Sequence, residues 1–241
     1  MKRIGKEGRY QDDFDWDVYT PRYMAQLAHV TEKHTPCLSQ GHYRVVDGKI
    51  ALDEGLPDLY ARHTALYETV LNLQPRSVME VGCGGGDHLS NIQKLLPETE
   101  LHGCDRSAGQ LAFLRQRHPD LDGVDVFLHD IVAATLPFQA ELVYTQSVLQ
   151  HIATGRHLAA LWHIVLAATK YVILVENWRC HDWYRDLRVL SVIRYFPWEE
   201  IHFYVNTATS KQYPLICSRE PLPCPPYQVV VTDDEQYRGA L

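Results

Sequence analysis

Residues 78–86 read Val-Met-Glu-Val-Gly-Cys-Gly-Gly-Gly, an apolar run that ends in a glycine turn. A helix-like segment follows from about residue 87 to residue 96, so the pattern predicts a strand, a tight turn and a helix. In an open parallel sheet this turn makes room for a nucleotide-like ligand, because glycine accepts positive φ and lets a ligand lie against bare main chain. A tight turn without any ligand is the alternative. The candidate ligand contacts in this stretch are Glu80, Gly82, Cys83, Gly84 and Gly86.

The spacing of the glycines argues against a dinucleotide ligand. The G-x-G-x-x-G fingerprint, counted from Gly82, requires its third glycine at the position where this chain has Asp87. An acid at the start of the helix would repel the pyrophosphate that this fingerprint places there. The chain has instead an acid, Glu80, followed by glycines at alternate positions.

A second acid follows the glycine turn at the spacing expected of a residue that binds a ribose. Residues 100–104 predict a second strand, and Asp105 closes it, 19 residues after Gly86. An acid about 20 residues after the glycine turn holds the ribose diol in this architecture, because a carboxylate accepts strong hydrogen bonds from both hydroxyls. Asp105 also precedes a helix predicted over residues 108–117, so a helix cap is the alternative, and both roles are compatible.

Two later strand-like segments also end in polar residues. Residues 124–128 lead into His129-Asp130-Ile131, and residues 141–145 lead into Gln146-Ser147-Val148-Leu149-Gln150-His151-Ile152. Together with the glycine turn and Asp105, these landmarks resemble those of the class I S-adenosylmethionine (SAM) methyltransferases, in the same order. The resemblance covers roughly residues 56–177.

The resemblance implies an α/β, Rossmann-like class I methyltransferase fold, with a seven-stranded, mostly parallel sheet in the order 3-2-1-4-5-7-6 and helices on both faces. It implies SAM as the cofactor, with Glu80 near the methionine ammonium and Asp105 on the ribose. Asp130 would accept from the adenine amine, and Ile131 would pack on the ring. The cofactor contacts predicted for this chain are Tyr19, Tyr23, Glu80, Gly82, Cys83, Gly84, Gly86, Asp105, Arg106, Gln110, Asp130, Ile131, Gln146 and Ser147.

Length and composition fit a globular protein of one α/β domain with a modest extension: the chain has 241 residues and a net charge of −7. The acidic balance argues against a nucleic-acid partner, whose affinity comes mainly from Lys and Arg. Six cysteines without a C-x-x-C pair make a zinc ribbon improbable. No signal peptide or membrane-spanning segment is evident, so we expect a cytoplasmic protein that does not bind a membrane. A homodimer is a candidate assembly.

The first 55 residues do not follow the sheet pattern, and we divide the chain into an extension, residues 1–55, and a SAM-binding domain, residues 56–241. Tyr19 and Tyr23 are spaced by one helical turn, and we interpret the segment that contains them as a lid over the cofactor. Packing of this segment on the sheet edge is the alternative. Further predicted elements are a hairpin turning at Asp47-Gly48, helices over residues 57–72, 156–169 and 183–195, a strand over residues 171–175, and a strand pair over residues 202–206 and 215–218. The resemblance implies that the last strand is antiparallel.

Two histidines are candidate catalytic bases. His151 follows the strand over residues 141–145, at the end of the sheet where the acceptor should bind, and a histidine can take a proton near neutral pH. A histidine bonded to a loop carbonyl is its alternative. His181 lies in an aromatic segment after the next strand and could be oriented by Asp182; a solvated loop is the alternative there.

We predict no metal. The 13 histidines include His151, His157 and His163, but a spacing of six residues does not keep side chains on one helix face.

The function predicted from these observations is methyl transfer from SAM to an oxygen or nitrogen atom of a small-molecule acceptor. Specialised-metabolite biosynthesis is the setting suggested by analogy with similar stand-alone chains. Two alternatives stay open: a protein or RNA methyltransferase, and a SAM-binding module that has lost transfer and serves as a partner subunit or sensor.

Overall fold

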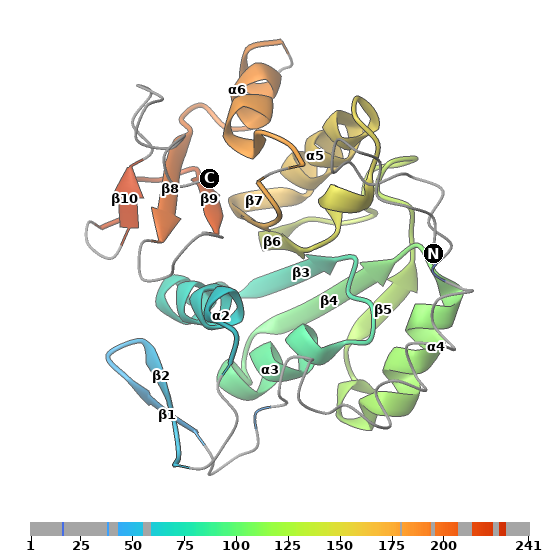
Figure 1. Cartoon of the computed structure of the whole chain (residues 1–241), viewed down its shortest axis with the longest axis vertical. Helices are drawn as coiled ribbons and strands as arrows, with labels where there is room; N and C mark the ends of the chain where they lie inside the picture. The colour runs from blue at the N-terminus through green and yellow to red at the C-terminus, as the bar shows by residue number, and fades with distance from the viewer. Residues whose placement is uncertain are drawn as a thin grey trace. The chain divides into compact units, whose positions relative to one another are not determined.

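The computed structural model describes residues 16, 38, 43–54, 59–178, 180–193, 196–206, 214–223 and 227–229. The described residues fall into two compact units, one within Asp15–His129 and one within Asp130–Leu241 (Figure 1). Each unit contains parallel strands joined through helices, as the alternation of apolar runs and amphipathic segments predicts.

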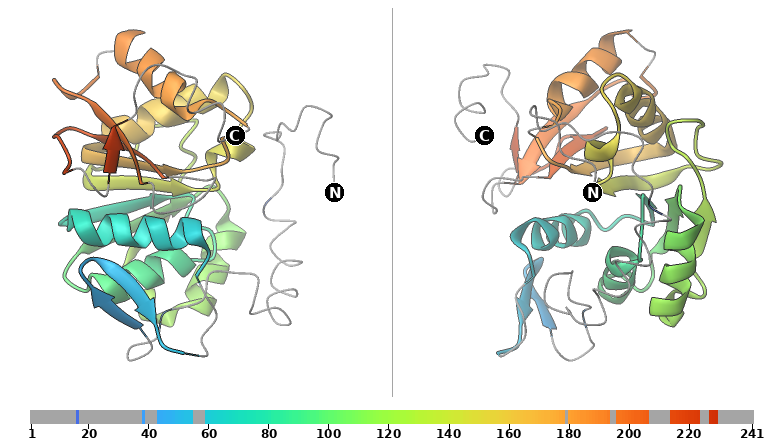
Figure 2. Two further views of the ribbon diagram at one scale, coloured as in Figure 1. Left: turned by 60° about the vertical axis from the view of Figure 1, so that its left-hand side comes forward. Right: turned by 45° about the vertical axis from the view of Figure 1, so that its right-hand side comes forward.

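The first unit opens with a β-hairpin packed on a helix. Strands β1 (Tyr43–Val46) and β2 (Lys49–Leu52) are antiparallel. Asp47 and Gly48, between them, both have positive φ, as a two-residue hairpin turn requires, which confirms the predicted turn. Helix α2 (Ala61–Leu73) supplies Glu68, whose carboxylate accepts from Ile50 N at 3.1 Å and from Lys49 Nζ at 2.8 Å. Figure 2 shows the hairpin lying beside this helix.

The remainder of the first unit is a parallel sheet with its crossover helices. Its elements are β3 (Ser77–Val81), α3 (Asp87–Leu95), β4 (Glu100–Asp105), α4 (Ala108–Arg117), the short helix η1 (Pro119–Leu121) and β5 (Asp125–Leu128). Strand β4 pairs in parallel with β3 on one side and with β5 on the other. The register sets Val81 beside Cys104, so the turn after β3 and the residue that ends β4 emerge at the same edge of the sheet.

The second unit is a mixed sheet with two helices. Its elements are β6 (Ala140–Gln146), η2 (Leu149–His151), α5 (Arg156–Ala167), β7 (Ala168–Val175), α6 (Trp183–Ile193), β8 (His202–Asn206), β9 (Leu215–Ser218) and β10 (Tyr227–Val229). Strands β6 and β7 are parallel, whereas β9 is antiparallel to both β7 and β8, as predicted for the last strand. Counted from β3, the two units have the strand orders 1-2-3 and 4-5-7-6, the two parts of the order that the resemblance implies.

The structure shifts several predicted boundaries. Helix α2 begins at Ala61, not at residue 57, and α5 ends at Ala167 because β7 already starts at Ala168. Strand β10 was not predicted; it begins directly after a proline-rich stretch of sequence, residues 221–226, and pairs with β8.

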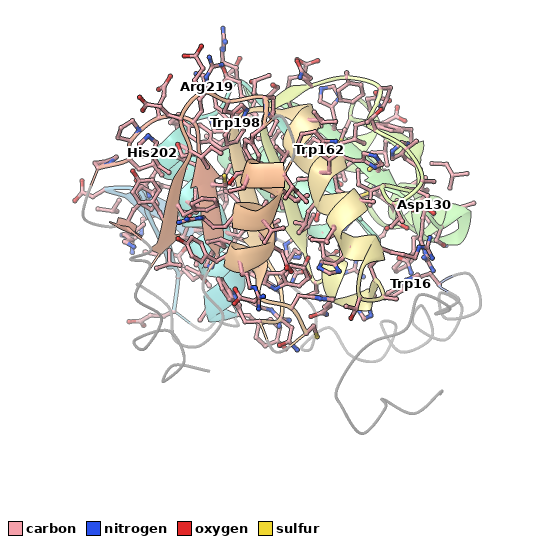
Figure 3. The ribbon with its side chains drawn as sticks, turned by 90° about the horizontal axis from the view of Figure 1, so that it is seen from above. Trp16, Asp130, Trp162, Trp198, His202 and Arg219 are labelled. Atoms are coloured by element: carbon pink, nitrogen blue, oxygen red, sulfur yellow. The ribbon has the colours of Figure 1, made fainter. Side chains whose placement is uncertain are left out.

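An aromatic cluster joins α5 to the segment that precedes β8. The ring of Phe196 lies 6.4 Å from Trp162 and 5.5 Å from Trp198, measured between centroids. Trp162 and Trp198 are labelled in Figure 3. Trp198 is buried, and its indole N–H donates to the carbonyl of Ala168 at 3.1 Å, which satisfies the polar end of a buried ring.

None of the helices in the described ranges is long and apolar enough to span a membrane. The proposed division at residue 55 stays a prediction, because most of the chain before residue 43 lies outside the described residues.

Candidate cofactor and active site

The glycine turn has the backbone that its sequence predicts. Gly82, Gly84 and Gly86 all have positive φ, which favours glycine. At Gly86 a second requirement applies: a Cβ atom there would lie 2.6 Å from Cγ of Leu114 on α4. At Gly84 a Cβ would meet only Oε1 of Gln110, at 3.5 Å, so a ligand can approach this stretch of main chain.

Asp105 is bonded to the glycine turn. One carboxylate oxygen, Oδ2, accepts from the amide of Gly84 at 3.0 Å, and the other, Oδ1, accepts from the amide of Ser107 at 2.8 Å. Burial raises the pKa of Asp105, and these two donors act in the opposite direction. The cap of α4 is Ser107, whose Oγ accepts from Gln110 N at 3.1 Å, so the helix-cap role considered for Asp105 belongs to its neighbour.

Glu80 lies within β3 and is only 1% exposed. Its charge acts on Cys83: the pKa of this thiol is raised well above its usual value by burial first, and then by the carboxylates of Glu80 and Asp105. Cys83 is therefore a neutral thiol at physiological pH and not a nucleophile. The amides of Gly82 and Cys83 both donate to the carbonyl of Cys104, at 2.7 and 3.0 Å, and tie the turn to β4.

Asp87, the acid that replaces the third dinucleotide glycine, points to α4. Its Oδ1 accepts from Arg117 Nε at 2.7 Å and from His118 Nε2 at 2.8 Å. Burial alone would raise the pKa of Asp87, but His118 and Arg117 hold it below its usual value. The charge of Asp87 is thus compensated within the first unit. The argument against a dinucleotide therefore rests on the missing glycine more than on repulsion.

The predicted adenine contacts lie at the start of the second unit. Asp130, labelled in Figure 3, accepts from the amide of Val132 at 2.9 Å through Oδ1. Ile131 is buried, and its carbonyl accepts from Nδ1 of His163 at 2.6 Å. Local bonds thus hold both residues in place, and their contacts with adenine stay a prediction.

The loop after β6 contains a residue in an unfavourable conformation. Ser147 has φ +57°, in the left-handed region that glycine favours. Its amide donates to Val175 O on β7 at 3.0 Å, and its Oγ accepts from Nε2 of Gln146 at 3.0 Å. His151 ends η2, two residues beyond Leu149, and its amide donates to Val148 O at 3.0 Å.

Glu176 holds the same loop from the end of β7. It is 2% exposed, and its two carboxylate oxygens accept from two amides of the loop, Val148 N at 2.9 Å and Gln150 N at 3.2 Å. Burial raises the pKa of Glu176 to about 7, against the effect of these donors. Sequence analysis singled out the segment that begins at Glu176 but not this residue. The available signal was an acid directly after a fully apolar strand.

His181 has a different environment from the one predicted. Its ring stacks on His157, with centroids 3.9 Å apart and an interplanar angle of 26°, and its Nε2 donates to Ile152 O at 3.4 Å. Asp182, predicted to orient His181, accepts instead from Arg185 N at 3.1 Å at the start of α6. The carboxylate beside the two histidines is Asp186, whose Oδ2 lies 3.0 Å from His157 Nε2.

His157, His181 and Asp186 each offer a ligand atom for a metal ion, and these atoms lie within 4.8 Å of one another. Two geometric facts favour a hydrogen-bonded stack of these three side chains over a metal site. The rings are nearly parallel, so their in-plane lone pairs do not converge on one point as a tetrahedral site requires. Gly155 N donates to His157 Nδ1 at 3.1 Å, so the ring proton sits on Nε2 and is donated to Asp186.

Comparison with known proteins identifies the domain. The family described as "Methyltransferase domain" matches residues 79–170, which include the glycine turn, Asp105 and the loop that Glu176 holds. This chain carries a class I SAM-dependent methyltransferase domain. SAM is the methyl donor of this family, and the predicted family, fold class and cofactor are confirmed.

A solved structure of a TehB-like SAM-dependent methyltransferase from Corynebacterium glutamicum matches the methyltransferase fold over most of the chain. It covers 84% of this chain and 99% of its own length, with a TM-score of 0.56 and 12% identity, which supports the fold alone. Among curated relatives, a trans-aconitate 2-methyltransferase from Acidovorax sp. (strain JS42) is 30% identical over 105 residues, or 40% of each chain. Another from Yersinia pestis (strain Pestoides F) is 27% identical over 111 residues, or 42% of each chain.

This chain therefore matches less than half the length of those relatives. Within residues 79–170 the structure brings the glycine turn, Asp105 and Gln110 together, and it places Ser147 and His151 in the loop after β6, directly after Gln146 at the end of that strand. Arg106 is exposed. Tyr19 and Tyr23 lie outside the described residues, so the lid stays a prediction.

Proposed function

We propose that this chain transfers a methyl group from SAM to an oxygen or nitrogen atom of a small-molecule acceptor. The observation that carries the proposal is the bond between Asp105 and Gly84. A carboxylate has about four acceptor positions, and the two amides occupy one on each oxygen. The backbone amide of Arg106 also bonds this carboxylate, and the acceptor capacity that remains is offered to a ribose hydroxyl.

The residues present fit the cofactor in their chemistry. Bound SAM supplies a methyl group on a sulfonium, an electrophile that needs no activation by the protein. Glu80 offers a buried negative charge for the methionine ammonium, and the main chain at Gly84 is open to a ligand. Asp130 and Ile131 supply an acceptor and an apolar side chain for adenine. Alignment of donor and acceptor is then the main work of the protein.

A hydroxyl acceptor would need a base, and His151 and His181 are the candidates. His151 follows β6 in the loop that Glu176 holds, and His181 is oriented by its stack on His157 and by Ile152 O. An amine acceptor needs only to be neutral and aligned. The lid would come from the segment that contains Tyr19 and Tyr23.

The choice of a small acceptor is supported by the relatives and by charge. The curated relatives are named for trans-aconitate, a small carboxylate. The net charge of −7 disfavours a nucleic-acid substrate. A role in specialised-metabolite biosynthesis follows only by analogy and is part of the proposal.

Binding and transfer test the proposal separately. Calorimetry should show binding of S-adenosylhomocysteine and none of NAD(H). The protein and radiolabelled SAM are then incubated with four acceptor classes. These are small carboxylates including trans-aconitate, a mixture of amino sugars and hydroxylated aromatic compounds, protein, and RNA. Label in a small molecule supports the proposal. Label only in protein or RNA, or binding without transfer in any class, overturns it in favour of the corresponding alternative.

A further inference from the structure

The loop after β6 needs an external support to keep its conformation. A non-glycine residue with the φ of Ser147 costs about 1–2 kcal/mol, and such a residue persists only where its surroundings hold it. The helix that follows, η2, is a single short turn, Leu149–His151, and cannot hold the loop by its own hydrogen bonds. The bond from Ser147 N to Val175 O secures only the first residue.

Glu176 supplies the missing support beyond Ser147. Its Oε1 accepts from Val148 N and its Oε2 from Gln150 N, so both oxygens of one carboxylate are bonded to the turn that ends at His151. Thr145 on β6 also acts on this carboxylate and lowers its pKa. Since β6 pairs with β7 up to Gln146 and Val175, the support comes from the rigid sheet on both sides.

The arrangement requires an acceptor on both oxygens. A carboxyl group has an acceptor lone pair on each oxygen whether or not it is ionised, whereas a carboxamide accepts at one atom and presents an N–H₂ group at the other. A glutamine at this position would therefore set a donor against the amide of Val148 or Gln150. Because the site is buried, water cannot restore the lost bond.

We propose that Glu176 is a positioning residue for methyl transfer, whose carboxylate holds the segment from Ser147 to His151 in the conformation that meets cofactor and acceptor. The inference rests on the proposed function for its catalytic consequence. Glu176 is too buried and too fully bonded to touch the reacting atoms, and it acts through the loop.

The test compares Glu176→Gln with Glu176→Asp and with a matched control, Glu141→Gln. Glu141 is also a buried glutamate of the second unit, but it lies near the opposite end of β6 and pairs with Lys170 at 3.3 Å. For Glu176→Gln we expect hydrogen exchange at the amides of Val148 or Gln150 to accelerate about tenfold or more, and turnover at saturating SAM to fall by a similar factor. Glu176→Asp keeps a carboxyl group, so part of the slow amide exchange and part of the turnover should be recovered. Glu141→Gln should change neither.

The two parts of the inference fail in distinguishable ways. Amide exchange needs no turnover, so unchanged exchange in Glu176→Gln overturns the role of the carboxylate even if no acceptor is found. Faster exchange with turnover equal to that of Glu141→Gln overturns the catalytic consequence. If Glu176→Gln does not fold, Glu176→Asp carries the same test. A further expectation is non-additivity: in a His151→Ala background, the loss caused by Glu176→Gln should shrink, because the loop no longer presents a base. Full additivity would contradict action through His151.

Discussion

The amide of Gly84 donates to the carboxylate of Asp105 at 3.0 Å, so the acid that ends β4 and the glycine turn that follows β3 form one bonded structure. The parallel register of β3 and β4 brings them to the same edge of the sheet. A ligand held by this carboxylate therefore also lies against the turn, which is what a cofactor with a ribose and a flat base requires.

Replacing Asp105 by alanine should weaken binding of S-adenosylhomocysteine by about 1.5–3 kcal/mol, the range for hydrogen bonds to a charged group. Calorimetry measures the affinity. Asp122→Ala, which removes an exposed acid of the same unit, is the control and should leave the affinity unchanged. Wild-type affinity in a folded Asp105→Ala protein would mean that Asp105 only supports the turn and Ser107.

Gly86→Ala should destabilise the fold, because the new Cβ has both a positive φ and a contact of 2.6 Å with Leu114. Overpacking of this kind costs about 1–3 kcal/mol, which thermal unfolding would record as a lower Tm. Gly123→Ala is the matched control, since nothing lies within 4 Å of its Cβ position. Equal Tm values for the two variants would show that Leu114 on α4 can shift to accommodate the new Cβ without loss of stability.

Much of this architecture was predictable because it is local. The hairpin at Asp47-Gly48 and the strand and helix on either side of the glycine turn follow from periodicity and turn chemistry, and the antiparallel β9 follows from the family resemblance. The bonds of Glu176 to Val148 and Gln150 were not predictable, because they join residues that lie 26 or more positions apart. For the same reason the adjacent pair His181-Asp182 was misleading: Asp186, one helical turn further on, reaches the histidines through His157.

Stability should depend on pH through Glu176. Burial raises the pKa of its carboxyl from 4.5 to about 7, so the folded state binds this proton more tightly than the unfolded state. The resulting stabilisation is complete below pH 4.5 and is lost as the pH rises through about 7. The titratable neighbour is Cys180, whose pKa is raised by burial and by Glu176. Denaturant unfolding measures the free energy of unfolding. Between pH 5 and pH 8 this free energy should therefore contain a contribution that falls with pH in the wild type and is absent from Glu176→Gln. Parallel curves for the two proteins would contradict the assignment to Glu176.

The variant His151→Ala tests whether His151 is the general base for a hydroxyl acceptor. If His151 takes the proton of a hydroxyl acceptor, turnover should fall roughly 10²–10⁴-fold, while affinity for S-adenosylhomocysteine stays near that of the wild type. The rising limb of the pH–rate profile should disappear as well. His202→Ala, on β8, is the control and should leave the profile intact. A loss below about tenfold would indicate that His151 only positions the acceptor, and His181→Ala becomes the next variant.

The lid prediction is tested by removing residues 1–35, a cut that spares Leu38. The described structure gives the reason for this limit: Leu38 is buried, and its amide donates to Oδ1 of Asn91 on α3 at 2.7 Å, so removing it would break a buried hydrogen bond. The shortened protein should remain folded, bind S-adenosylhomocysteine more weakly and lose methyl transfer, because Tyr19 and Tyr23 no longer cover the ligand. In the full chain, the same segment should become more resistant to protease when S-adenosylhomocysteine is added. Tyr19→Ala with Tyr23→Ala in the full chain separates the two tyrosines from the rest of the segment. Full activity in the shortened protein would mean that the acceptor pocket is built from the loops after β6 and β7 alone.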